Sequence, residues 1–176
     1  MNKQPETTEK TRQRFLDVFC ELYTQKPIEK ISVQEITRKA GYNRSTFYQY
    51  FFDIYDLLAY VENDVLEYIQ RNRTKTVDIS THTPIEDILK MFKEKGTYLK
   101  ALMGDYGNFR FLELIKKEFS IIAKSDNEIT PYLLEFRIST VLTLFHQWER
   151  RGEDLPVEKM LGLIDDLYAN GISSFL

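Results

Sequence analysis

The segment ISVQEITRKAGYNRSTFYQYF, residues 31–51, constrains the fold most strongly because it carries start and stop signals for two short helices. Ser32 followed by Glu35 is a capping box, which places a helix start at Ser32. Gly41 suits the left-handed backbone at a helix C-terminus, and Asn43 is a good N-cap for the next helix. Two helices of about eight residues joined by a Gly-containing turn predict a helix-turn-helix, which places its second helix in the DNA major groove.

The second helix of this unit carries different residue types on its two sides. At about 100° per residue, Phe47 and Phe51 fall on one side, where they can pack on Ile36 and Ala40 of the first helix. The opposite side holds four polar residues: Arg44, Ser45, Tyr48 and Gln49. Arg suits guanine or phosphate, Ser and Tyr hydroxyls suit phosphate, and Gln suits adenine. The pattern predicts a DNA-reading face backed by a hydrophobic anchor.

The rest of the chain also has helical periodicity. Apolar residues recur at spacings of three and four and no segment alternates strictly, so the sequence predicts an all-α fold. The polar stretch 74–83 divides the chain into residues 1–72, a head with its recognition unit at 32–51, and residues 73–176, a regulatory and dimerisation domain. The other expected helices span 8–25, 54–73, 85–95, 97–103, 106–124, 131–151 and 157–172.

Composition excludes several classes of protein. Hydrophobic residues make up 43% of the 176 residues, and 12 Phe and 11 Tyr supply more apolar area than a disordered chain has. The net charge is −3, but residues 1–50 hold nine Lys and Arg against six Asp and Glu, a positive end suited to approaching DNA. The single Cys20 excludes an intramolecular disulfide, and no apolar run forms a signal peptide or reaches the ~18 residues of a membrane span. We therefore expect a soluble cytoplasmic protein with no membrane partner.

The longer sequence ISVQEITRKAGYNRSTFYQYFFDIYDLL resembles the TetR/AcrR family of transcriptional regulators, with its T-F-Y-x-Y-F core and following D-L-L. The resemblance extends over residues 8–68. It implies a three-helix DNA-binding head, a long fourth helix leading into a helical ligand-binding and dimerisation body, a homodimer, and a palindromic double-stranded operator. By position, it implies that Phe47 is the core anchor and that six residues contact DNA: Arg44, Ser45, Thr46, Tyr48, Gln49 and Tyr50.

One position departs from the family pattern. Many members carry a Lys at the start of the fourth helix, where it contacts a phosphate, and this chain carries Ile54 there. Phosphate anchoring at this point must come from backbone N–H groups at the helix start, from Tyr55, or not at all.

The last two expected helices are apolar on more than one side, which a single buried stripe does not require. In the TetR/AcrR family the last two helices form a four-helix bundle between two subunits. In such a dimer, two heads about 34–36 Å apart match successive major grooves. The alternative is that the apolar side chains of the last two helices only complete the core of one subunit. The predicted dimer interface comprises Leu144, Phe145, Trp148, Ile164, Leu167 and Tyr168.

Aromatic residues of the body are candidates for an effector pocket, since ligand sites in helical proteins often lie between helices. Ordinary core packing is the competing explanation for each of them. The composition suits a small hydrophobic or aromatic effector. The candidate lining residues are Tyr98, Met103, Phe109, Phe119, Phe136 and Trp148.

The sequence carries no motif for catalysis, a metal or a cofactor. It has no H-E-x-x-H, G-x-S-x-G or Walker sequence, and neither His82 nor His146 lies three residues after a Glu. We therefore predict a non-enzymatic, sequence-specific transcriptional regulator: a homodimeric repressor released from its operator by a small molecule. The alternative is a helical dimeric interaction or ligand-binding protein that no longer reads DNA.

Overall fold

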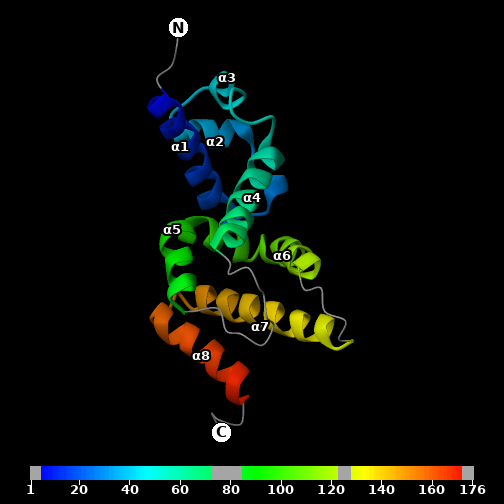
Figure 1. The fold of residues 1–176 in the computed structure, drawn as a ribbon. Coiled ribbons are helices and arrows are strands. Elements are labelled where there is room, and N and C mark those ends of the chain that lie inside the picture. Colours follow the sequence, from blue (N-terminus) through cyan, green and yellow to red (C-terminus); the bar gives the residue numbers. More distant parts are fainter. Residues whose placement is uncertain (1–4, 73–84, 123–127, 172–176) are drawn as a thin grey trace.

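The computed structural model of the protein describes residues 5–72, 85–122 and 128–171. Every regular element within these ranges is a helix, which confirms the predicted all-α fold (Figure 1). No helix in this part of the chain is both long and apolar enough to cross a membrane. In chain order the elements are α1 (Pro5–Tyr23), the 3-10 turn η1 (Ile28–Lys30), α2 (Val33–Ala40), α3 (Arg44–Phe47), α4 (Ile54–Asn72), α5 (Ile85–Met103), α6 (Asn108–Ile122), α7 (Thr130–Arg150) and α8 (Val157–Asn170).

The helices divide between two ends of an elongated molecule. Figure 1 shows α1, α2 and α3 together at one end, and α7 and α8 at the other. Helix α4 leads from the first group toward α5 and α6. We call the described residues of α1 to α4 the head, and those of α5 to α8 the body.

The local signals of the recognition unit take the predicted form. The Ser32 hydroxyl accepts a hydrogen bond from the Glu35 amide at 3.2 Å and caps α2. Gly41 ends α2 with φ at 80°, the left-handed conformation that glycine adopts without steric penalty. The Asn43 side chain accepts from the Thr46 amide at 2.8 Å and caps α3. These three residues turn the chain twice within a dozen positions and so aim α3 away from α2.

The core of the head is a cluster of aromatic rings around Phe47. Phe47 is fully buried, and its ring lies 5.4 Å from Phe15 of α1 and 5.6 Å from Phe51 between ring centroids. Phe51 in turn packs edge-on against Tyr60 of α4. Rings at these separations stabilise one another beyond the area they bury. The cluster ties α1, α3 and α4 into one unit.

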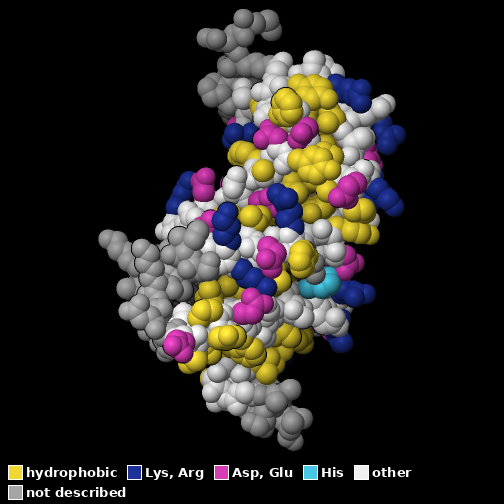
Figure 2. All heavy atoms as spheres, turned by 90° about the vertical axis from the view of Figure 1, so that its right-hand side faces the viewer, with side chains coloured by type: hydrophobic (Ala, Val, Ile, Leu, Met, Phe, Trp, Pro, Cys, Tyr) yellow, Lys and Arg dark blue, Asp and Glu magenta, His cyan; other side chains and the backbone are white. Residues whose placement is uncertain are grey.

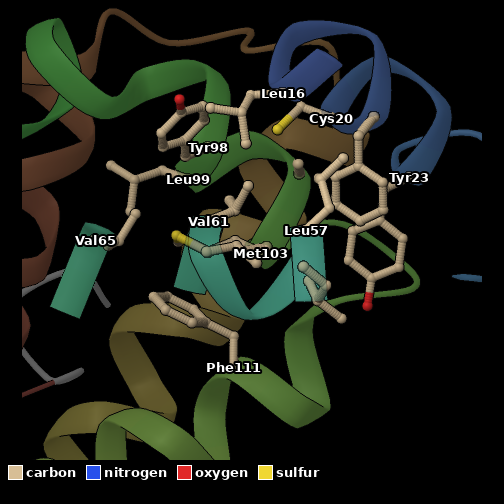
Figure 3. Packing of buried hydrophobic residues seen from close by; sticks show 14 of the residues in the cluster. Leu16, Cys20, Tyr23, Leu57, Val61, Val65, Tyr98, Leu99, Met103 and Phe111 are labelled. Carbon is tan, nitrogen blue, oxygen red and sulfur yellow. The ribbon is translucent and has the colours of Figure 1, made fainter. Parts of the chain in front are cut away.

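The hydrophobic core continues from the head into the body. Figure 3 shows side chains of α1, α4, α5 and α6 that point toward one another. Burial raises the pKa of the Cys20 thiol in this cluster to about 12, so Cys20 packs as a small hydrophobic side chain. The labelled members are Leu16, Cys20, Tyr23, Leu57, Val61, Val65, Tyr98, Leu99, Met103 and Phe111.

Two helices differ from the predicted boundaries. Helix α3 has four residues, and beyond Phe47 the backbone tightens: the Gln49 amide bonds the Thr46 carbonyl at 3.2 Å and the Tyr50 amide bonds the Phe47 carbonyl at 2.9 Å. The chain needs this tighter turn to reach the start of α4. Residues 85–103 form one helix where two were predicted, because Gly96 weakens a helix by about 1 kcal/mol relative to Ala without breaking its hydrogen bonds.

We expect Phe47→Ala to lower the free energy of unfolding by about 3–5 kcal/mol, because it leaves a cavity in the aromatic cluster. Phe52→Ala is the matched control, since the Phe52 ring is 84% exposed and its removal should change stability by less than about 0.5 kcal/mol. Urea denaturation followed by circular dichroism measures both. Equal losses for the two variants would show that Phe47 is not the anchor.

Candidate nucleic-acid interface

The polar side of α3 faces solvent as predicted. Arg44, Ser45, Tyr48 and Gln49 are exposed, while Phe47 between them is fully buried. The ring of Tyr48 stands edge-on to that of Phe47, with centroids 5.6 Å apart, so the buried anchor also orients an exposed phenol. The arrangement presents a cation, two hydroxyls and an amide on one face of the head.

The Asn43 side chain organises the start of this face. Its Oδ1 atom accepts hydrogen bonds from the Ser45 hydroxyl at 2.7 Å and from the Thr46 hydroxyl at 2.9 Å, in addition to the Thr46 amide. Both hydroxyl protons are therefore engaged, whereas a phosphate oxygen can only accept. The Ser45 and Thr46 hydroxyls can donate to a phosphate only by breaking their hydrogen bonds to Asn43.

Thr46 and Tyr50 are half-buried, unlike the other predicted contact residues. The Tyr50 ring packs 6.1 Å from that of Phe15, and a second tyrosine, Tyr42, packs 5.3 Å from the same ring. The Tyr42 hydroxyl accepts a long hydrogen bond of 3.4 Å from Thr11. Tyr50 therefore supports α3 from behind more than it extends the exposed face.

The basic residues of the head fall into paired and unpaired groups. Lys26 pairs with Glu35 at 2.6 Å and Lys39 with Glu21 at 2.8 Å, so these two cations are neutralised within the head. Figure 2 shows Lys and Arg side chains beside hydrophobic ones on the part of the surface formed by the head. Within the described part of the chain, the exposed cations that form no ion pair with another residue of the head are Arg14, Lys30, Arg38 and Arg44.

The start of α4 carries carboxylates where a phosphate contact was considered. The Asp53 carboxylate accepts from the amides of Tyr55 and Asp56, both at 2.8 Å. The Asp56 carboxylate accepts from the Phe52 amide, also at 2.8 Å. These three amides are therefore occupied, and two negative charges stand beside them. Of the options open at Ile54, the occupied amides weaken the first, and the half-exposed Tyr55 or no phosphate contact at all remain.

Sequence reasoning missed Phe52, which is 84% exposed directly after the buried Phe51. The signal was the Phe51-Phe52 pair itself. Two adjacent bulky rings at the end of a turn cannot both enter one core, so one of them must face solvent.

The residues predicted to line an effector pocket do not surround one cavity. Tyr98 and Met103 belong to the shared core, where the Tyr98 hydroxyl meets Gln13 of α1 at 3.1 Å. Phe109 and Phe136 are 75% and 58% exposed. The side chain of Phe119 lies outside the described residues, as does the whole of His82.

Trp148 does line a groove, together with residues that were not predicted. The open groove of about 770 Å³ runs between α5 and the loop that joins α7 to α8. Its apolar floor includes Phe92, whose ring is edge-on to Trp148 at 6.3 Å. Its charged lining residues are Glu153, Asp154, Glu158 and Lys93. Glu153 pairs with Lys100 at 2.7 Å and Asp154 with Arg151 at 2.5 Å, so two of the three carboxylates are neutralised.

The predicted dimer residues are partly used within the subunit. Phe145 and Ile164 are 4% and 5% exposed and complete the core of the protomer, so they are not available to a partner. Leu144, Trp148, Leu167 and Tyr168 are half-buried. A different apolar stripe is exposed near the N-terminal end of α7, comprising Tyr132, Leu133 and Phe136 of the helix and Ile129 just before it.

Polar contacts fix α4 and α1 to the body. The buried Glu62 carboxylate accepts hydrogen bonds from Nε and Nη2 of Arg110 on α6, at 2.5 and 2.9 Å. The Tyr23 hydroxyl donates to the Tyr106 carbonyl at 3.1 Å, and burial followed by the Glu62 charge raises the Tyr23 pKa. An ion pair between Lys95 and Asp64 joins α5 to α4.

The turn between α5 and α6 also touches α7. The Asp105 carboxylate lies 2.7 Å from His146, and a Cβ on Gly107 would come within 2.6 Å of the Leu102 carbonyl oxygen. Only glycine fits where the turn approaches α5 so closely. In the described part of the chain, no three His, Cys, Asp or Glu residues are placed to hold a metal ion.

Comparisons with known proteins fit this geometry. Residues 15–61 match the family described as "Bacterial regulatory proteins, tetR family". A solved structure titled "Structural analysis of fatty acid degradation regulator FadR from Bacillus halodurans" has a similar fold, with a TM-score of 0.61 and 13% sequence identity, covering 98% of each chain. A search of curated proteins gave no match.

We expect Arg110→Met to lower the free energy of unfolding by about 2–3 kcal/mol, because it leaves the buried Glu62 carboxylate without its donor. Adding Glu62→Gln in the same chain should restore part of the loss, since a neutral amide is less costly to bury. Arg71→Met is the control, because the Arg71–Glu67 pair is exposed on both sides and such pairs contribute little. Urea denaturation measures all three; equal effects of Arg71→Met and Arg110→Met would contradict a structural role for the Glu62 pair.

Proposed function

We propose that this chain, which belongs to the TetR family through its N-terminal domain, is a homodimeric repressor released from a palindromic operator by a small molecule. The observation that carries the DNA-binding part is the exposed polar side of α3 on the fully buried Phe47. A protein that used α3 only for packing would not need a cation, an amide and a phenol together on its outer side. Such a regulator acts in the cytoplasm, where bacterial DNA is.

In the proposed complex α3 enters the major groove. Arg44 and Gln49 reach base edges, where Arg pairs with guanine and Gln with adenine. The Tyr48 hydroxyl donates a hydrogen bond to a phosphate. The Ser45 and Thr46 hydroxyls do the same once they no longer donate to Asn43. Tyr50 keeps a supporting role, with its hydroxyl at the edge of the interface.

Dimerisation would place two such heads on one side of the duplex. We assign the interface to the exposed apolar stripe of α7 and the adjoining Tyr168 of α8, whose ring is edge-on to Phe136 at 5.9 Å. Contiguous exposed apolar side chains of this kind mark interaction sites. The half-buried Leu144, Leu167 and Trp148 would border it, whereas Phe145 and Ile164 would not take part.

We place the effector in the groove lined by Phe92 and Trp148. Its aromatic floor suits a small hydrophobic or aromatic molecule. A bound molecule would act by changing the separation of the heads, with a coupling of about 1–3 kcal/mol between the two sites.

The test of DNA reading is selection of duplexes from sheared genomic DNA by the wild type and by an Arg44→Ala/Tyr48→Ala variant. We expect the wild type to enrich a short palindrome and the variant to enrich none. On the enriched duplex, Arg44→Ala alone should weaken binding by about 1–3 kcal/mol and relax preference at one base pair. Gln147→Ala, an exposed polar residue on α7, is the control and should bind as the wild type does.

If the wild type enriches nothing, even at low salt, the protein does not read DNA in its free form. That result would favour the helical ligand-binding alternative, to which the occupied amides at the start of α4 already give some support. Enrichment by the double variant would instead move the DNA contact to another surface.

The test of the dimer is Tyr132→Glu/Phe136→Glu, which puts two charges into the proposed interface. We expect sedimentation equilibrium to give the mass of two chains for the wild type and of one chain for the variant, with helical content unchanged. Lys90→Glu, at an exposed position of α5 outside the stripe, should leave the dimer intact. A variant that remains dimeric would show that the subunits associate through another face.

A further inference from the structure

Three backbone amides at the start of α4 are occupied by carboxylates, which disfavours a phosphate there. The Tyr55 and Asp56 amides are held by Asp53, and the Phe52 amide is held by Asp56, each at 2.8 Å. A phosphate would have to displace these bonds and approach two carboxylates. Electrostatic anchoring is therefore unfavourable at this end of the face.

Aromatic carbon is exposed there instead. Phe52 is 84% exposed, more than any other large hydrophobic residue in the described part of the chain, and Tyr48 and Tyr55 are 57% and 50% exposed. Exposed apolar clusters next to polar and charged groups mark interaction sites. Phe52 lies in the short link between α3 and α4, four residues after Tyr48 and three before Tyr55.

The backbone of Phe52 and the ring of Tyr48 are held in place before any partner arrives. The hydrogen bond from the Phe52 amide to Asp56 fixes the backbone at Phe52. The preceding residue, Phe51, is anchored by its ring contacts with Phe47 and Tyr60. Tyr48 is oriented by Phe47. A pre-ordered contact loses less conformational freedom on binding than a flexible one.

DNA offers apolar groups that such rings can cover. The thymine C5-methyl group lies in the major groove and makes apolar contacts with side chains such as Phe. The carbons of deoxyribose lie along its edge. The carboxylates of Asp53 and Asp56 do not oppose an uncharged contact of this kind. The unpaired Arg44 provides a positive charge that complements the DNA backbone.

Resting on the DNA-binding function proposed above, we infer that Phe52 is a DNA-contact residue that packs on apolar carbon of the operator. This contact takes the place of a cation–phosphate contact at the start of α4. The carbon belongs either to a thymine methyl group or to a deoxyribose.

The test measures binding to a duplex that the wild type enriches from a random-sequence pool, by fluorescence anisotropy at several salt concentrations. We expect Phe52→Ala to bind about tenfold more weakly, or about 1.4 kcal/mol, with an unchanged slope of log K against log salt. Phe52→Leu, which keeps apolar carbon, should lose less affinity. Phe109→Ala, which removes a 75% exposed ring on α6, is the control and should bind as the wild type does.

A duplex with uracil in place of thymine distinguishes the two sources of carbon. If the effect of Phe52→Ala disappears on the uracil duplex, the ring contacts a thymine methyl group; if it persists, the ring contacts deoxyribose. Either result supports the inference. Wild-type affinity in Phe52→Ala, or a salt slope that falls by about one as expected for a lost phosphate contact, would overturn it.

The two proposals fail in different ways. A wild type that enriches no duplex overturns both the DNA-binding function and the role of Phe52. A wild type that enriches a duplex which Phe52→Ala binds equally well leaves the function standing and removes only the role of Phe52. Thermal denaturation of Phe52→Ala checks that the head stays folded, as its exposure leads us to expect.

Discussion

The packing of Phe47 is the interaction on which the recognition face depends. Helix α3 has four residues, too few for a helix to be stable on its own in water. Its position comes from the Asn43 cap at one end and from Phe47 within the aromatic cluster at the other. Because Phe47 fixes the rotation of α3, it decides which side chains face outward. The polar face is a consequence of where one ring is buried.

The same cluster connects the head to the rest of the molecule. Phe51 contacts Tyr60 of α4, and two residues further along α4 the Glu62 carboxylate accepts hydrogen bonds from Arg110 of the body. The Tyr23 contact with Tyr106 adds a link from α1 to the turn that touches α7 through Asp105. A displacement of that turn would therefore act on the head through both α1 and α4. This is the physical route by which we propose that an effector changes the spacing of two heads.

The sequence predicted correctly the features of the fold that depend on interactions between residues close in the chain. Ser32, Gly41 and Asn43 have the predicted capping roles, because a cap depends on residues three or four positions away. The length of α3 was wrong, because the tight turn beyond Phe47 depends on where α4 begins. The break predicted at Gly96 was wrong as well, because packing on both sides of α5 outweighs the weakness of one residue.

The candidate sites in the body could be predicted less well, for the same reason. Phe145 and Ile164 are apolar residues whose burial inside one subunit depends on how α7 and α8 pack. Periodicity shows that a helix face is apolar, not which neighbour covers it. Phe52 is the opposite case: from the sequence a phenylalanine is expected in the core, but in the structure this one is exposed to solvent.

The central claim is that the outer side of α3 is the surface that meets DNA. Its most direct test is an amide NMR titration of the isotope-labelled protein with a duplex that it enriches. We predict that the largest shift changes fall on residues 43–50, with α6 and the exposed stripe of α7 unaffected at the same duplex concentration. Changes concentrated in the body, with the amides of α3 unmoved, would contradict the account.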